Sequence, residues 1–125
     1  MASAAIAIMD RDKMDPTLEK IRAFRDERDW KQFHNPKDLA IAISIEAGEL
    51  LEHFLWHSSE NSHARAIERQ EAISEEIADI AIYLLELSDE LGIDIPTAIE
   101  RKLSKNAVKY PVSKAKGRAD KYTEL

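Results

Sequence analysis

Three helix-start signals divide this chain and constrain its fold more than any other feature. Each combines a capping residue with a proline in the first helical turn, and they are Asp15-Pro16, Asn35-Pro36 and Asp94-Ile95-Pro96. A side-chain oxygen at the cap accepts a hydrogen bond from the first turn, where proline lacks only an N–H that has no helical partner. Apolar residues follow each signal at helical rather than alternating spacing. The chain is therefore predicted to be all-α.

Four helices are expected, over residues 16–28, 36–56, 64–91 and 95–109. The second has apolar residues on all sides, which predicts that it is largely buried. Gly92 is suited to end the third. Of the residues, 44% are hydrophobic, mostly aliphatic, and only 6% are aromatic, which favours helices over a sheet. Short connections between four helices predict a four-helix bundle.

Bulk properties predict one domain and exclude several functions. We expect a bundle domain over 16–111, a flexible N-terminus over 1–15 and a basic, loosely ordered tail over 112–125. The absence of cysteine excludes disulfides and thiolate metal sites. A net charge of −6 argues against general affinity for nucleic acid, although Arg101–Lys121 holds eight Lys or Arg and one acid. No apolar run approaches the roughly 20 residues of a membrane span, so a cytoplasmic protein is expected.

Two acidic pairs interrupt the most apolar helices and mark the candidate site. Glu46 and Glu49 lie in AIAISIEAGELLEHFLW, and Glu76 and Asp79 lie in SEEIADIAIYLLEL. The i, i+3 spacing places both carboxylates of a pair about 60° apart on one helix face. If the two pairs face each other, four carboxylates converge and require a cation. Acids at this spacing also occur on ordinary solvated faces, so spacing alone leaves both interpretations open.

Oxygen ligands without Cys or His favour Mg²⁺, with Mn²⁺ as a substitute, or Ca²⁺. Magnesium commonly shares its coordination shell with substrate phosphates, so the acids point to phosphate chemistry. A di-iron carboxylate bundle is the nearest rival, but it needs two helical Glu-x-x-His motifs. The one match, Glu60-Asn-Ser-His63, lies in a polar linker.

Together these motifs resemble the MazG-like family of all-α nucleotide pyrophosphohydrolases. The family pattern is Glu-x-x-Glu, a spacer, then Glu-x-x-Asp, which here is Glu46-Ala-Gly-Glu49, 26 residues, and Glu76-Ile-Ala-Asp79. The segments ERDWKQFHNP and KLSKNAVKYP extend the resemblance, which is strongest to the dCTP pyrophosphatase-like branch. It implies Mg²⁺-dependent hydrolysis of a nucleoside triphosphate, with dCTP or a modified dCTP as the expected substrate, to the monophosphate and pyrophosphate. The four acids would be both the metal ligands and the catalytic residues.

The resemblance also implies residues that bind the nucleotide. Phosphate or sugar contacts would come from one face of the last helix and its end, at Lys102, Asn106, Lys109 and Tyr110. Base contacts would come from Trp30, His34, Trp56 and Tyr83, although aromatic residues at such spacings are also common in cores. Ile21 stands where a polar or aromatic pocket residue is expected in the animal dCTP enzymes.

Family members of this kind act as homodimers or dimer-based homotetramers, so a dimer or dimer of dimers is expected here. Three alternatives stay open: a non-catalytic nucleotide or metal sensor, a purely structural bundle, and a phosphoribosyl-ATP-type pyrophosphohydrolase. Either Glu46 or Glu49 is a candidate for orienting the attacking water.

Overall fold

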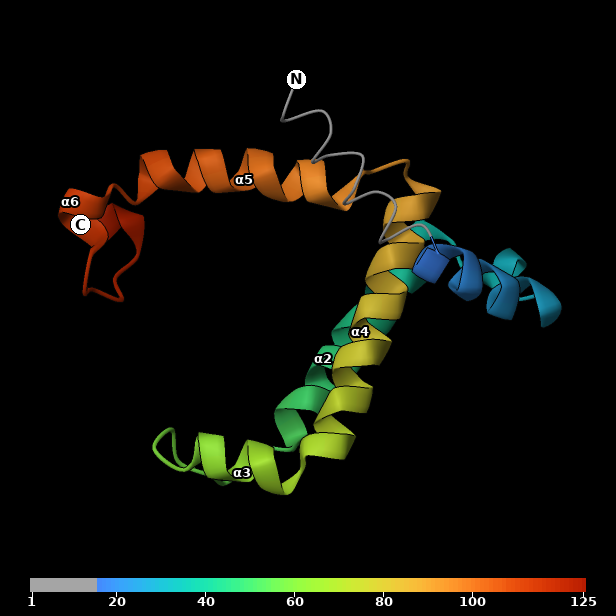
Figure 1. The fold of residues 1–125 in the computed structure, drawn as a ribbon, viewed down its shortest axis with the longest axis horizontal. Helices are drawn as coiled ribbons and strands as arrows, with labels where there is room; N and C mark the ends of the chain where they lie inside the picture. Colours follow the sequence, from blue (N-terminus) through green and yellow to red (C-terminus); the bar gives the residue numbers. More distant parts are fainter. Residues whose placement is uncertain (1–15) are drawn as a thin grey trace. The chain divides into compact units, whose positions relative to one another are not determined.

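The computed structural model describes residues 16–125, and every regular element in that range is helical. The first of two compact units extends to Gly92, and the second is Ile93–Leu125. The described part of the first unit contains a helix over residues 16–27, η1 (Lys31–Phe33), α2 (Pro36–Glu52), α3 (Ser62–Glu68) and α4 (Gln70–Glu90). The second contains α5 (Ile95–Lys109), α6 (Val112–Ala115) and η2 (Tyr122–Glu124) (Figure 1). The prediction of an all-α fold is confirmed.

Local capping signals are confirmed wherever they fall within the described residues. The Asn35 side chain accepts a hydrogen bond from the Asp38 backbone N–H at 2.9 Å, and α2 begins at Pro36. Asp94 accepts one from the Thr97 N–H at 3.2 Å, and α5 begins at Ile95. Gly92, with φ 64°, follows the end of α4 in the left-handed conformation that glycine tolerates. The predicted cap at Asp15 and the predicted flexible segment 1–15 lie outside the described residues.

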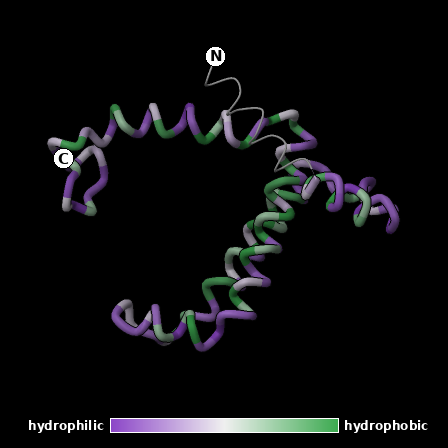
Figure 2. Tube along the Cα trace, in the orientation of Figure 1, coloured by the Kyte–Doolittle hydropathy of each residue, from purple (hydrophilic) through white to green (hydrophobic). Residues whose placement is uncertain are grey.

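The pairing of α2 with α4 is the main helix–helix contact among the labelled elements. The two helices lie side by side, with hydrophobic residues along both (Figures 1 and 2). Leu39 of α2 and Ile73 of α4 are buried, as is Ile21 of the helix over 16–27. The prediction that α2 is largely buried is wrong for the single chain, since Ile41 and Ile45 are 49% and 57% exposed. Among the labelled helices α2 packs extensively only on α4, which covers one side of it.

Two predicted helix boundaries are wrong. Helix α2 ends at Glu52 and not at residue 56, because residues 53–56 form turns and Trp56 has a left-handed φ of 67°. The helix expected over 64–91 is two helices, α3 and α4, separated by Arg69 with φ −110° and ψ 23°. No glycine or proline marks either break, so neither is encoded by a local signal.

The helix over residues 16–27 is fastened to α4 by polar contacts as well as by Ile21. Arg22 forms an ion pair with Asp89 near the end of α4. Arg25 is buried, with 6% of its surface exposed, and donates through Nε to Asp26 at 2.8 Å. The Arg22–Asp89 pair holds this helix against α4, where the helix forms one wall of the cavity described below.

The second unit has its own small aromatic cluster. Tyr110, at the end of α5, packs edge-on against Tyr122 with 5.9 Å between ring centroids. Lys109 Nζ lies 4.8 Å from the centre of the Tyr122 ring. The predicted domain boundary at residue 111 and the predicted looseness of 112–125 stay predictions. Within residues 16–125 no helix is long and apolar enough to cross a membrane, and the cytoplasmic location also stays a prediction.

Candidate active site

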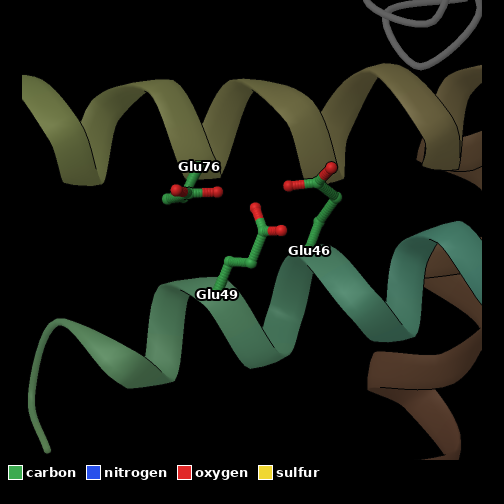
Figure 3. Close-up of side chains that lie close together, drawn as sticks. All are labelled: Glu46, Glu49 and Glu76. Atoms are coloured by element: carbon green, nitrogen blue, oxygen red, sulfur yellow. The ribbon is translucent and has the colours of Figure 1, made fainter.

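Three carboxylates from two helices meet between α2 and α4. Glu46 and Glu49 point from α2 toward Glu76 on α4 (Figure 3). One ligand oxygen from each of the three lies within 4.8 Å of the others. Helical spacing explains the first pair, because residues three apart share a face. The packing of α2 on α4 then supplies the third.

Two of these acids have buried oxygen atoms that lack a partner. Among the described residues, no group donates a hydrogen bond to Glu46 Oε2 or to Glu76 Oε2. Burial, followed by a hydrogen bond that the protonated Glu46 donates to Glu49 and by the negative charge of Glu49, raises the pKa of Glu46 from 4.5 to about 7. Crowded carboxylates without a counter-charge are costly, and a bound cation removes that cost. The cluster therefore has the chemistry of a site for a hard divalent cation.

Asp79, the fourth predicted acid, is not part of this close group. Its negative charge nevertheless contributes to the raised pKa of Glu46, after the burial of Glu46 and the effect of Glu49. It also lines the neighbouring cavity. Its predicted role as a metal ligand stays a prediction.

Next to the acids lies a cavity of about 410 Å³ walled by the helix over 16–27, the segment after it, and α4. Three of the predicted base-binding residues, Trp30, His34 and Tyr83, line it. Their rings form a row, with centroids 6.3 Å apart for Trp30–His34 and 6.4 Å for His34–Tyr83. The remaining lining residues are Thr17, Lys20, Ile21, Phe24, Asp79, Ile82 and Glu86. A flat aromatic ligand fits such walls.

Tyr83 connects this cavity to the acid cluster. Burial raises the pKa of its hydroxyl, and the negative charges of Glu46, Glu86, Asp79 and Glu49 raise it further, in that order. Tyr83 therefore lines the cavity and also lies within range of the charges of Glu46 and Glu49 in the cluster. The cavity and the cluster are thus parts of one site.

Comparison with known proteins agrees with this geometry. The profile of the MazG-like family matches residues 41–125. The chain belongs to the MazG-like family. It is 42% identical to dCTP pyrophosphatase 1 of Rattus norvegicus and 39% identical to that of Homo sapiens, each over 117 residues. Each of these matches covers 89% of this chain and 69% of the relative.

A solved structure gives the same result for the fold. A pyrophosphatase from Archaeoglobus fulgidus is 46% identical, with a TM-score of 0.77 covering 79% of this chain and 93% of that chain. The resemblance to the MazG-like family, and within it to dCTP pyrophosphatases, is confirmed.

Trp56 does not join the cavity of this MazG-like chain. Its side chain is 94% exposed, and its φ of 67° is strained for a bulky residue. An exposed indole on a strained backbone contributes little to the stability of a single chain, and such outliers are frequent at binding sites. The predicted contact of Trp56 with the base stays a prediction.

The predicted phosphate-binding residues belong to the second unit. Lys102, Asn106 and Lys109 lie on α5, and Tyr110 caps its end. Their expected contacts with phosphate or sugar stay predictions.

Two residues that the sequence analysis did not select also belong to the site. His53 lies just after α2, and its Nε2 is 3.7 Å from Glu76 Oε1. Glu86, on α4, lines the cavity and has only 4% of its surface exposed. Glu86 follows Asp79 by seven residues, so helical spacing places both on one face and would have identified it.

A larger cavity, of about 520 Å³, lies where α3 and α4 meet the turn after α2. It is lined by Phe54, Ser62, His63, Ala66, Ile67, Gln70, Ile73, Ser74 and Ile77. None of these is a carboxylate, so this cavity does not match the phosphate chemistry of the acid cluster.

Proposed function

We propose that this protein is a magnesium-dependent nucleoside triphosphate pyrophosphohydrolase that converts dCTP, or dCTP with a modified base, to the monophosphate and pyrophosphate. One observation carries the proposal: three convergent carboxylates with unsatisfied buried oxygens adjoin a cavity walled by aromatic rings. The relatives named dCTP pyrophosphatase 1 support the substrate.

The residues present fit a divalent cation of the magnesium type. Glu46, Glu49 and Glu76 supply oxygen ligands, and Asp79 is the proposed fourth. The buried oxygens of Glu46 and Glu76 have no other partner in the described chain. When bound, Mg²⁺ neutralises phosphate charge and makes a coordinated water more acidic. Mn²⁺ is the expected substitute because it accepts the same ligands.

The chain's own groups then bind, orient and accept protons. Trp30 and Tyr83 border the cavity and offer their faces to the base, which orients the triphosphate toward the acids. A carboxylate of the cluster, Glu46 or Glu49, accepts a proton from the water that attacks the α-phosphorus. The bond between the α-phosphorus and the bridging oxygen breaks, and pyrophosphate leaves. Lys102, Asn106, Lys109 and Tyr110 are proposed to contact phosphate or sugar.

A homodimer or homotetramer is part of the proposal. Unit one of a single chain leaves Ile41, Ile45, Leu51 and Trp56 at least 49% exposed. Apolar surface of this extent on one small unit is typical of an interaction surface. A second copy is the proposed cover, because closed homo-oligomers bury the same patch on each subunit.

The test is pyrophosphate release from a panel of dNTPs and NTPs with Mg²⁺ or Mn²⁺. We expect pyrophosphate and not phosphate, with dCTP among the best substrates. Glu76→Gln should lower kcat/KM by about 100-fold or more, because it removes a charged ligand. Glu75→Gln, an exposed neighbour on the same helix, is the matched control and should be near wild type. Nucleotide binding without any pyrophosphate release would favour the non-catalytic sensor instead.

A further inference from the structure

Glu86 is a buried carboxylate with one oxygen that no described residue satisfies. Only 4% of its surface is exposed, and it lines the cavity beside Trp30 and Tyr83. One oxygen, Oε1, lies 3.2 Å from His34 Nδ1. The other, Oε2, is buried and has no hydrogen-bond partner among the described residues. A buried oxygen of this kind is costly unless a ligand satisfies it.

Arg25 places a positive charge near Glu86, but no hydrogen bond joins it to Glu86 Oε2. Arg25 is also buried, at 6% exposed, and its Nε donates to Asp26 at 2.8 Å. The pKa of Arg25 is raised chiefly by that hydrogen bond, and the negative charges of Asp26, Glu86 and Asp89 contribute. Arg25 therefore lies close enough to Glu86 to interact with its charge, while Oε2 has no hydrogen-bond partner among the described residues.

The contact with His34 makes a second acceptor. A carboxylate only accepts, so in this pair His34 Nδ1–H donates to Glu86 Oε1. In the neutral imidazole that tautomer leaves a lone pair on Nε2, which then also accepts. His34 lines the same cavity. Glu86 and His34 thus each bring one hydrogen-bond acceptor to the lining of the same cavity.

We propose that Glu86, together with the His34 that it positions, reads the exocyclic amino group of the base and so sets base specificity. The inference rests on the proposed function, since it assigns the cavity to the base of the nucleotide. An amino group offers two N–H donors, which match Glu86 Oε2 and His34 Nε2. Cytosine and adenine carry such a group beside a ring nitrogen, whereas uracil, thymine and hypoxanthine present a carbonyl oxygen there.

The proposed selectivity between bases follows because a buried hydrogen-bond acceptor that meets no donor costs free energy. A carbonyl oxygen opposite Glu86 would place two acceptors together and leave the buried carboxylate unsatisfied. Sites built to hydrogen-bond a substrate N–H reject analogues that lack it far more strongly than apolar pockets reject a change of size. The neighbours Ile21, Phe24 and Ile82 are apolar and make no such distinction, and the other polar groups of the lining come from Thr17, Lys20, Asp79 and Tyr83.

The test compares kcat/KM for dCTP, dUTP, dATP and dITP in the wild type, Glu86→Gln and Glu86→Ala. Glutamine keeps the shape and adds an N–H that suits a carbonyl oxygen. We expect the dCTP/dUTP ratio to fall by about 10- to 100-fold in Glu86→Gln, partly because dUTP becomes a better substrate. Glu90→Gln, an exposed acid one turn later on α4, is the matched control and should keep the wild-type ratio. A dATP/dITP ratio that responds in place of dCTP/dUTP would assign the same amino-group readout to adenine.

Binding of the products separates this inference from the proposed function. Calorimetry with dCMP and dUMP needs no turnover, and the wild type should prefer dCMP by a margin that Glu86→Gln reduces. If the wild type releases pyrophosphate but both variants keep its base preference, the role of Glu86 is overturned and the enzyme activity stands. If no triphosphate is hydrolysed, the dCMP preference and its loss in Glu86→Gln still decide the role of Glu86. Circular dichroism of each variant identifies a loss that is due to unfolding.

Discussion

The protonation of Glu46 is a property of the site that can be measured without a substrate. Its carboxyl is surrounded by Glu49, Glu76 and Asp79, and its pKa is raised to about 7, first by burial and then by Glu49. An acid in this state keeps its proton near neutral pH until a cation replaces it. Metal binding and proton release at Glu46 are therefore coupled.

The metal-free protein should lose stability as the pH rises from about 4.5 to about 7. In that window folded Glu46 keeps its proton while the unfolded chain, with a carboxyl pKa of about 4.3, has lost it. Because the folded state then binds more protons, its free energy of unfolding falls as the pH increases. Melting temperatures of the wild type and Glu46→Gln in EDTA measure this, and the variant should lack that part of the slope. Equal slopes of melting temperature against pH in the two proteins would contradict the raised pKa of Glu46. Added Mg²⁺ should strongly stabilise the wild type and not Glu46→Gln.

At the scale of helices, the sequence predicted the starts of α2 and α5 and the ends of α4 and α5, but neither the end of α2 nor the break at Arg69. Asn35 and Asp94 cap their helices through contacts within four residues, so the signal is entirely local. The breaks at Trp56 and Arg69 carry no glycine or proline, and neither has a local signal. Such ends depend on tertiary packing, which spacing along the chain does not reveal.

The site, too, was predicted only in part from the sequence. Three of the four selected acids meet because helical spacing and the α2–α4 contact bring them together. Trp30, His34 and Tyr83 line one cavity, and their predicted contacts with the base stay predictions. Glu86 was overlooked because it has no place in the motif, although its spacing from Asp79 places it on the same face. His53 lies beyond the end of α2, where helical spacing gives no guide.

The exposed face of α2 is the proposed interface between copies of this chain. Ile41, Ile45 and Gly48 follow i, i+4, i+7 spacing, the two isoleucines are about half exposed, and no other group comes within 4 Å of where a Gly48 side chain would begin. We expect Ile45→Glu to shift the protein from oligomer toward monomer in sedimentation or light scattering. Lys37→Glu, at an exposed position at the start of α2, is the control. A monomeric wild type, or an Ile45→Glu oligomer of unchanged size, would contradict the proposed interface.

For the whole molecule, the decisive feature is that a cation site and a base pocket share one compact unit. Helix α2 supplies Glu46 and Glu49, α4 supplies Glu76, Asp79, Tyr83 and Glu86, and the helix over 16–27 closes the pocket. Helix α4 contributes to both features, so a change that displaces α4 should remove metal and nucleotide binding together. This common origin is what makes a single measurement decisive.

The most direct measurement is anomalous diffraction from crystals of the full chain with Mn²⁺ and a non-hydrolysable dCTP analogue. We expect a manganese peak at about 2 Å from carboxylate oxygens of Glu46, Glu49 and Glu76. The triphosphate should contact the same ion, and the base should lie in the cavity beside Trp30 and Tyr83. A nucleotide bound elsewhere, or a manganese ion that none of the three glutamates contacts, would contradict the central claim.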